Sequence, residues 1–245
     1  MDTALLVGLS RQMAARRTMD VVANNLANMT TTGFKAESVL FEEYMVEVTD
    51  EAGSTQQIAM VLDQGVSLNF EEGRMDPTGN PFDLAISGDG FFVVETPDGN
   101  QYSRSGNLRT DEQGILTNMD GRPILNEGGS TITLLPENGI PSIAHDGTIT
   151  TPDGSVVDRI QLVRFDNPEG LSKVGNSLYR TDEIPTPAEE STILQGNLET
   201  SNVVPILEMT RMIDTTRMYT SISKMIETSD QLTRDTIRRL ADTNA

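Results

Sequence analysis

The chain has 245 residues, with 37 acidic side chains against 18 basic ones and a formal net charge of −19. A protein that binds nucleic acid through its phosphates, or that docks on an anionic membrane surface, needs a basic patch, so this charge balance argues against both classes of partner. There is no cysteine, which excludes disulfides, thiolate metal sites and a cysteine nucleophile.

Residues 1–32 are predicted to form an amphipathic helix. The segment contains no proline, and its apolar residues recur at helical spacing with arginines between them. An asparagine followed by threonines and Gly33 then gives a helix stop signal over 28–33. The residues of this helix that we expect in seams at a subunit interface are Leu5, Leu9, Met13, Met19, Val22 and Leu26.

The N-terminal apolar run, residues 4–9, does not resemble a secretory signal. It is shorter than a signal-peptide core, and Asp2 stands where basic residues are expected. No run approaches the ~18 apolar residues that a membrane span requires. We therefore expect no cleaved signal and no direct membrane insertion: either the protein stays in the cytoplasm, or it leaves by a route that does not use a cleaved signal.

Residues 33–68 are interpreted as a linking segment, in which 34–48 fit a helix and 50–57 resemble a loop. From residue 69 to 200, short β-rich runs such as Phe91–Thr96 alternate with turn residues. Asp-Gly dipeptides recur among these turns because glycine accepts the positive φ of tight hairpins. The pattern predicts an all-β outer domain over 69–200.

Residues 201–245 are predicted to form a second, longer helix. Ser201 or Asn202 fits the N-cap, and Pro205 falls in the first turn, where its missing N–H costs nothing. Two rows of heptad-like spacing follow, and one contains several threonines and serines, which weaken a coiled coil. The residues of this helix expected at a subunit interface are Met212, Met218, Tyr219, Ile222, Met225, Ile226, Leu232 and Leu240.

The expected architecture is an α+β fold. A helix from about 203 to 240 would be ~57 Å long at 1.5 Å per residue, too long for one small globular core to cover. The economical arrangement pairs the terminal helices with each other and with copies in other chains. Residues 1–32 plus 201–245 would form a coiled-coil core domain, and the mainly-β domain would be inserted between them.

Nothing in the sequence points to catalysis, and we predict no enzyme, no cofactor and no metal. The single histidine, His145, stands beside a turn, and no nucleophile elbow or zinc-binding motif is present. The Asp-Gly turns do not follow the ligand order of a calcium loop. Two alternatives stay open: a β-domain binding module that its helices oligomerise, and a hydrolase that uses His145.

Three stretches together resemble the axial proteins of the bacterial flagellum, the family of rod and hook proteins. They occur in the family's order across nearly the whole chain. The first lies where the first helix ends, the second enters the β domain, and the third precedes the second helix. The motif residues are Ala23, Asn24, Asn25, Leu26, Ala27, Asn28, Thr32, Gly33, Phe34, Lys35, Gly88, Asp89, Gly90, Phe91, Phe92, Gly196, Leu198, Glu199, Ser201, Asn202 and Val203.

The resemblance implies a structural subunit of the basal-body rod. Such subunits are exported unfolded through the flagellar type III apparatus, without a cleaved signal, and polymerise in the periplasm. Their partners are copies of themselves, other rod proteins and the export apparatus, and the hollow shaft transmits torque from motor to hook. The compact stretch between Lys35 and Leu84 favours a proximal-rod subunit, with a distal-rod subunit as the alternative.

Overall fold

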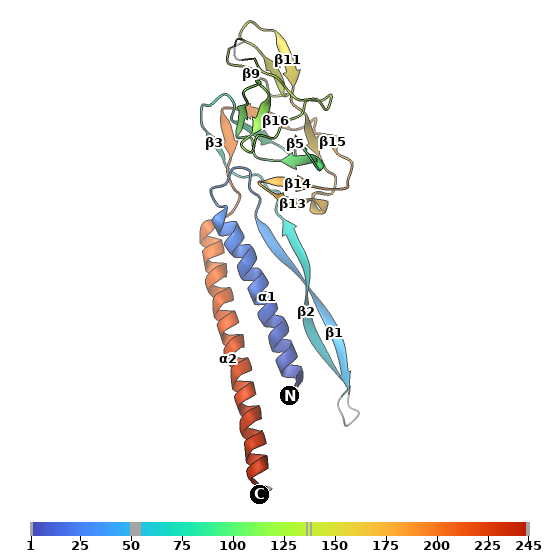
Figure 1. The fold of residues 1–245 in the computed structure, drawn as a ribbon, viewed down its shortest axis with the longest axis vertical. Helices are drawn as coiled ribbons and strands as arrows, with labels where there is room; N and C mark the ends of the chain where they lie inside the picture. The colour runs from blue at the N-terminus through green and yellow to red at the C-terminus, as the bar shows by residue number, and fades with distance from the viewer. Residues whose placement is uncertain (1, 50–54, 136, 138, 244–245) are drawn as a thin grey trace. The chain divides into compact units, whose positions relative to one another are not determined.

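The structure is a computed structural model that describes residues 2–49, 55–135, 137 and 139–243 (Figure 1). As predicted, the fold is α+β, with a helix near each end of the chain and strands between them. The chain divides into two compact units. The helical unit comprises residues 1–27, 37–67 and 204–245, and the β unit comprises residues 28–36 and 68–203.

The first helix, α1 (Asp2–Ala27), lies within the predicted segment and ends before the asparagine that begins the stop signal. The N–H of Thr31 donates to the carbonyl oxygen of Asn28 at 3.1 Å, which forms a turn directly after the helix. Gly33 then adopts a φ of +66°, a conformation that glycine accepts without steric cost. The turn takes residues 28–36 into the β unit.

The second helix, α2 (Pro205–Thr243), begins at the predicted proline, but the predicted N-cap is wrong. The carbonyl oxygen of Val204 accepts hydrogen bonds from the N–H groups of Leu207 and Glu208 at 3.0 and 3.2 Å, so Val204 occupies the cap position. Asn202 is used elsewhere, because its side chain bonds to backbone groups of the β unit.

The two helices of the helical unit run antiparallel and in contact (Figure 1). Asn25 Nδ2 lies 3.2 Å from Glu208 Oε2, and Thr216 Oγ1 lies 3.8 Å from Met19 Sδ. Farther along, a Cβ added to Gly8 would lie 3.2 Å from Ile226 Cγ1, so a glycine lets the helices approach closely. A half-buried row on α2 follows spacings of three and four: Met212, Thr215, Tyr219, Ile222, Ile226, Ser229 and Thr233.

A long hairpin, β1 (Glu37–Thr49) and β2 (Thr55–Leu68), completes the helical unit. The expected helix over 34–48 is therefore wrong, since aromatic and β-branched residues along β1 favour a strand. Of the loop expected over 50–57, residues 50–54 lie outside the described part and residues 55–57 belong to β2. The hairpin is tied to α1 by Val61 N–H donating to Ser10 Oγ at 3.0 Å and by an Arg17–Asp63 ion pair at 3.2 Å.

The β unit contains short strands, mostly joined by tight turns. A six-stranded sheet has the order β13-β14-β6-β5-β12-β15, a three-stranded sheet has the order β11-β10-β9, and three two-stranded sheets pair β16 with β4, β17 with β3, and β7 with β8. The bounds are β3 (Met75–Pro77), β4 (Leu84–Ser87), β5 (Phe91–Thr96), β6 (Gly99–Ser103), β7 (Leu108–Thr110), β8 (Leu116–Asn118), β9 (Ser142–Ile143), β10 (Thr148–Thr150), β11 (Val156–Arg159), β12 (Leu162–Arg164), the 3-10 turn η2 (Pro168–Gly170), β13 (Ser172–Gly175), β14 (Leu178–Arg180), β15 (Thr186–Pro187), β16 (Thr192–Gln195) and β17 (Asn197–Glu199).

Strand β5 separates two apolar cores of the β unit. Successive side chains of a strand point to opposite faces, so Phe92 joins an aliphatic core with Ile86 and Ile193 while Phe91 joins an aromatic core with Tyr179 and others. The ring centroids of Phe91 and Tyr179 lie 6.1 Å apart in an edge-to-face arrangement. The motif stretch around Phe91 therefore builds the centre of this unit.

Candidate functional site

The predicted interface residues of α1 fall into two groups. Val22 is buried, and Met19 and Leu26 are half-buried within the helical unit. The N-terminal group of three residues is open to solvent. Its members are Leu5, Leu9 and Met13, with exposed fractions of 42%, 47% and 65%. Their assignment to a subunit interface stays a prediction.

The predicted interface residues of α2 divide in the same way. In the half-buried row, Ile226 packs against Gly8 of α1, and Met212, Tyr219 and Ile222 lie on the same stripe of the helix. The neighbouring row is exposed: Met218, Met225 and Leu232 have exposed fractions of 58%, 53% and 63%. Leu240 lies on the last turns of α2, and its side chain is outside the described part.

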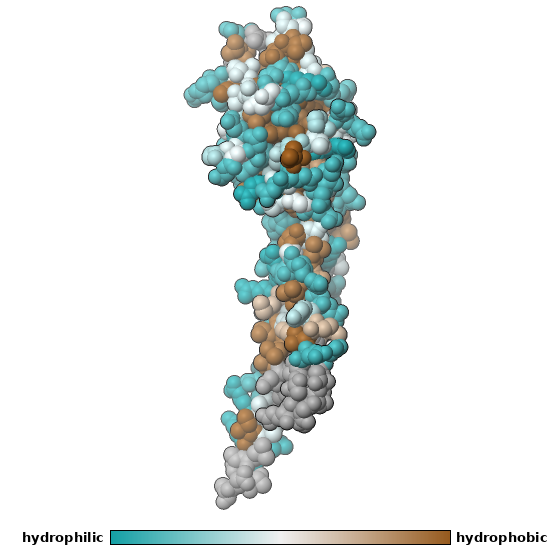
Figure 2. Space-filling view, turned by 90° about the vertical axis from the view of Figure 1, so that its right-hand side faces the viewer, coloured by the Kyte–Doolittle hydropathy of each residue, from teal (hydrophilic) through white to brown (hydrophobic). Residues whose placement is uncertain are grey.

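An apolar groove lies between α1 and the hairpin, with a volume of about 560 Å³. Figure 2 shows apolar atoms among polar ones on the hairpin face of the helical unit. The sequence did not predict that a hairpin forms one side of this groove, because residues 33–68 were interpreted as a linking segment. The apolar lining residues are Leu6, Leu9, Met13, Phe41, Met60, Val61 and Leu62, and charged residues at 16, 17, 20 and 63 complete it.

Two asparagines of the first motif join three pieces of the helical unit. Asn25 is 1% exposed, and its amide pairs with both backbone groups of Glu37: Oδ1 accepts from the N–H at 2.9 Å, and Nδ2 donates to the carbonyl at 2.8 Å. Asn24 Nδ2 donates to the Glu37 carboxylate at 3.1 Å. With its contact to Glu208, Asn25 links α1, β1 and α2 within one chain.

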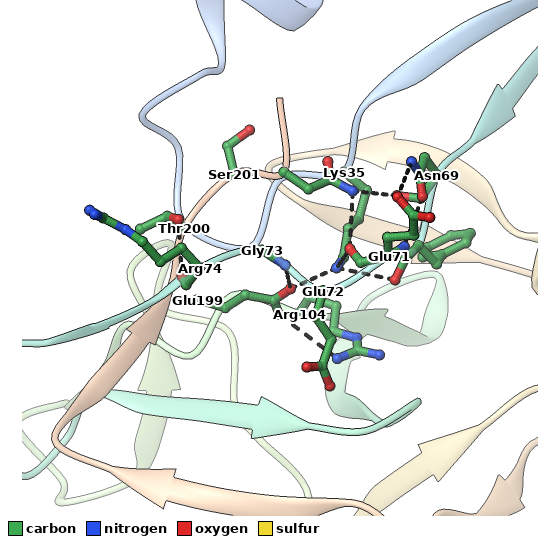
Figure 3. A network of polar contacts seen from close by, with 12 residues as sticks. Lys35, Asn69, Glu71, Glu72, Gly73, Arg74, Arg104, Glu199, Thr200 and Ser201 are labelled. Atoms are coloured by element: carbon green, nitrogen blue, oxygen red, sulfur yellow. Dashed lines mark hydrogen bonds and ion pairs between the residues drawn. The ribbon is translucent and has the colours of Figure 1, made fainter. Parts of the chain in front are cut away.

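A buried charge cluster occupies the β unit where the first and third motifs meet (Figure 3). Lys35 Nζ lies 2.6 Å from Glu199 Oε1, and both side chains are 0% exposed. The ammonium also donates to the carbonyl oxygens of Glu71 at 2.7 Å and Phe70 at 3.3 Å, and Glu199 Oε1 accepts from the N–H of Gly73 at 2.9 Å. The cluster thus ties three chain segments together.

A second cation, Arg104, lies on the other side of Glu199, with Nη1 3.8 Å from Oε2. Its guanidinium also stands over the ring of Phe91 at 5.0 Å, which brings the middle motif to the same place. Burial lowers the pKa of Arg104 and the pKa of Lys35, and the Glu199 charge partly opposes both shifts. No hydrogen bond among the described residues reaches Arg104 Nε, Arg104 Nη1 or Glu199 Oε2.

Further hydrogen bonds to backbone groups connect the first motif to the third. Gly33 N–H donates to the carbonyl oxygen of Glu199 at 2.8 Å, and Asn202 Oδ1 accepts from the N–H of Ala36 at 2.7 Å. Asn202 Nδ2 donates to the carbonyls of Asn69 and Glu71 at 2.8 and 3.0 Å. The first and third motifs are therefore neighbours in space, which the sequence order alone does not reveal.

The β unit also contains His145, the one histidine of the chain. Its Nδ1 lies 3.0 Å from the carbonyl oxygen of Ile193. His145 and Ser191 both line a cavity of about 220 Å³. No hydrogen bond in the described part of the chain joins His145 to Ser191. Within that same part, no group of three or more potential ligands is arranged to hold a metal ion. No described helix is both long and apolar enough to cross a membrane.

Comparison with known families matches three regions of the chain. Residues 5–35 match the family described as flagella basal body rod protein, residues 85–151 match the D1 domain of the flagellar hook protein FlgE/F/G, and residues 194–239 match the C-terminal region of the flagellar basal body rod FlgEFG protein. These regions include the three motifs.

Whole relatives align along nearly their full length. The chain is 41% identical to the flagellar basal-body rod protein FlgF of Caulobacter vibrioides, over 100% of both chains, and 36% identical to FlgF of Mesorhizobium japonicum, over 98% of both. It is 34% identical to the flagellar basal-body rod protein FlgG of Bacillus subtilis, over 96% of this chain and 97% of that one. The chain belongs to the flagellar basal-body rod protein family, with FlgF proteins among its strongest relatives.

Proposed function

We propose that this protein is a structural subunit of the flagellar rod and has no catalytic role. The subunit would be exported unfolded through the flagellar type III apparatus, without a cleaved signal, and would polymerise in the periplasm into the hollow shaft that carries torque from motor to hook. The whole-length similarity to rod proteins supports this role. Copies of the same chain and other rod proteins would be its partners.

The observation that carries the proposal is the exposed apolar surface of the helical unit. Solvent-exposed side chains on both helices include Leu9, Met13, Met218 and Leu232. A monomer rarely leaves such extended apolar faces open, and large exposed patches mark interaction sites. In the assembled rod, we infer that α1 and α2 pack as a coiled-coil core with the helices of neighbouring subunits, and that the β unit, as an inserted domain, lies outside that core.

A proximal position in the rod is the finer part of the proposal. The stretch between Lys35 and Leu84 is compact, and two FlgF proteins align over 98% or more of their length. A distal, FlgG-like position is the alternative, since FlgG proteins also align nearly completely. Labelled subunits located by electron microscopy near the motor end of the rod would support the proximal position, and label next to the hook would contradict it.

The role is tested by complementing a strain that lacks the gene. The unaltered chain is expected to restore swimming, whereas Ile222→Asp is expected to abolish it, because a charge then enters the contact between α1 and α2. Ser223→Asp is the matched control, since this neighbouring residue is exposed. If the strain without the gene builds complete rods and swims, the proposed function is wrong.

A further inference from the structure

Two exposed seams run along the helices of the helical unit. Most of each seam faces away from the contact between α1 and α2, although the methyl group of Met225 reaches Gly8 of α1, with Cε 3.4 Å from a Cβ added there. On α1, Leu6, Leu9, Met13, Arg16 and Asp20 follow spacings of three and four, and all five are exposed. On α2, the same alternation runs through Asp214, Met218, Ser221, Met225, Thr228 and Leu232, again all exposed. Such spacing places residues on one stripe of a helix and is typical of a helix that packs against another helix.

The α1 seam forms one wall of the apolar groove that the hairpin borders. Ser10 and Arg17 turn toward the hairpin, and Gly8 and Met19 turn toward α2, so the seam occupies a third face of α1. The N-terminal part of the seam, with Leu6, Leu9 and Met13, is apolar. Its C-terminal part, with Arg16 and Asp20, is charged. The face can therefore receive an amphipathic helix that has apolar residues and charged residues in the matching order.

We propose that the α2 seam of a second copy of this chain packs into this groove, an inference that rests on the proposed function. Charge fixes the direction. In an antiparallel pairing, Arg16 faces Asp214 of the second copy and Asp20 faces its Arg211, while Met13 meets Met218 and Leu6 meets Met225. In a parallel pairing that keeps Arg16 opposite Asp214, Asp20 would face Met218 and Met13 would face Arg211, so the second charge pair and the apolar pairs would be lost.

The charged groups are available for this contact. No ion pair among the described residues uses Arg16, Asp20 or Asp214. Arg211 bonds to Glu208 at 2.6 Å, but its side chain is 60% exposed. Opposite charges that face each other across an interface fix register and exclude wrong partners.

The direction of the pairing has a consequence for assembly. Within the chain, α1 and α2 are antiparallel, with Met19 beside Thr216 and Asn25 beside Glu208. The proposed contact is also antiparallel, so the two copies point the same way, offset by about three residues or ~5 Å at 1.5 Å per residue. One surface binds a different surface of the next copy, and such heterologous contacts build rings or open helical polymers.

Cysteine cross-linking tests the contact, because the chain has no cysteine of its own. Two differently tagged chains, one with Met13→Cys and one with Met218→Cys, are co-expressed in the strain that lacks the gene. A disulfide needs Cβ atoms about 3.5–4.5 Å apart, so mild oxidation of assembled basal bodies should give a dimer that carries both tags. Met209→Cys in place of Met218→Cys is the matched control. Met209 is exposed on a different face of α2, and the dimer should be lost.

The outcomes separate this inference from the proposed function. If both tagged chains are present in basal bodies and the cells swim, but the 13–218 dimer is absent or no stronger than a 13–13 or 13–209 dimer, the inference is wrong and the rod function stands. If neither chain enters basal bodies, while the unaltered chain is also absent from them, the rod function fails and the inference with it. Charge reversal gives a second measure: Arg16→Asp and Asp214→Arg should each reduce swimming, and the double variant should restore it.

Discussion

Lys35 and Glu199 are 164 residues apart in sequence, yet their side chains meet at 2.6 Å with no exposure to solvent. The pair joins the segment after α1 to the segment before α2. Both segments belong to the β unit, which therefore cannot be completed from the residues between 69 and 200 alone. This junction explains why motif residues from both ends of the chain are grouped around one carboxylate.

Lys35→Met is expected to destabilise the β unit by about 3–5 kcal/mol, because it leaves Glu199 buried without its short ion pair. Arg74→Met is the matched control. It removes an ion pair to Asp76 in which the arginine side chain is 79% exposed, so a loss of no more than about 1 kcal/mol is expected. Denaturant unfolding of both variants measures the free energy of unfolding. Equal losses would contradict the assigned importance of the buried pair.

A fragment of residues 69–203 is expected to be less stable than a fragment of residues 28–203. The shorter one lacks Phe34 and Lys35, which are 2% and 0% exposed in the β unit. It therefore loses apolar burial and leaves the Glu199 charge unpaired. Thermal unfolding followed by circular dichroism compares the two fragments, and indistinguishable midpoints would show that residues 28–36 are dispensable.

Gly33→Ala should cost more stability than Gly79→Ala. Both glycines have positive φ, +66° and +73°, which costs a non-glycine residue roughly 1–2 kcal/mol. At Gly33 an added Cβ would also lie 2.5 Å from the backbone nitrogen of Ser105, whereas nothing lies within 4 Å at Gly79. The difference between the two unfolding free energies isolates the steric clash. No difference would mean that the Thr32–Lys35 turn relaxes freely.

The aspartate of one Asp-Gly turn is expected to make stability sensitive to acid. The backbone N–H and the hydroxyl of Thr148 donate to the Asp146 carboxylate and hold its pKa below the ordinary value of 3.8. The folded state therefore binds the proton less readily than the unfolded state, so this stabilisation is present above pH 3.8 and is lost as pH falls through the lowered pKa. Asp146→Asn should flatten the acid dependence of the unfolding free energy between about pH 5 and 2. An unchanged slope would contradict the assignment.

The two helices could be predicted from sequence because each is long, periodic and free of internal proline. The hairpin could not. Its first strand carries apolar residues on both faces, and Leu40 and Phe41 next to Tyr44 and Met45 also fit a helical spacing. A strand that packs on one helix with part of its surface does not show clean alternation, so periodicity alone left the segment ambiguous.

No local sequence pattern predicted the buried charge cluster either. Lys35 and Glu199 each read as one charged residue in a motif, and only tertiary structure shows that they neutralise each other. The N-cap error at Asn202 has the same origin. Residue type permits an N-cap there, but the side chain bonds to Ala36, Asn69 and Glu71 instead. Long-range contacts, which sequence patterns do not encode locally, decided each case.

Electron cryomicroscopy of basal bodies purified from the encoding organism tests the central claim most directly. We predict density along the rod into which both helices and the β unit fit, with α1 of one subunit against α2 of the next. The same preparation from a strain that lacks the gene should show a missing or truncated rod. Complete rods of unchanged density in that strain would contradict the account.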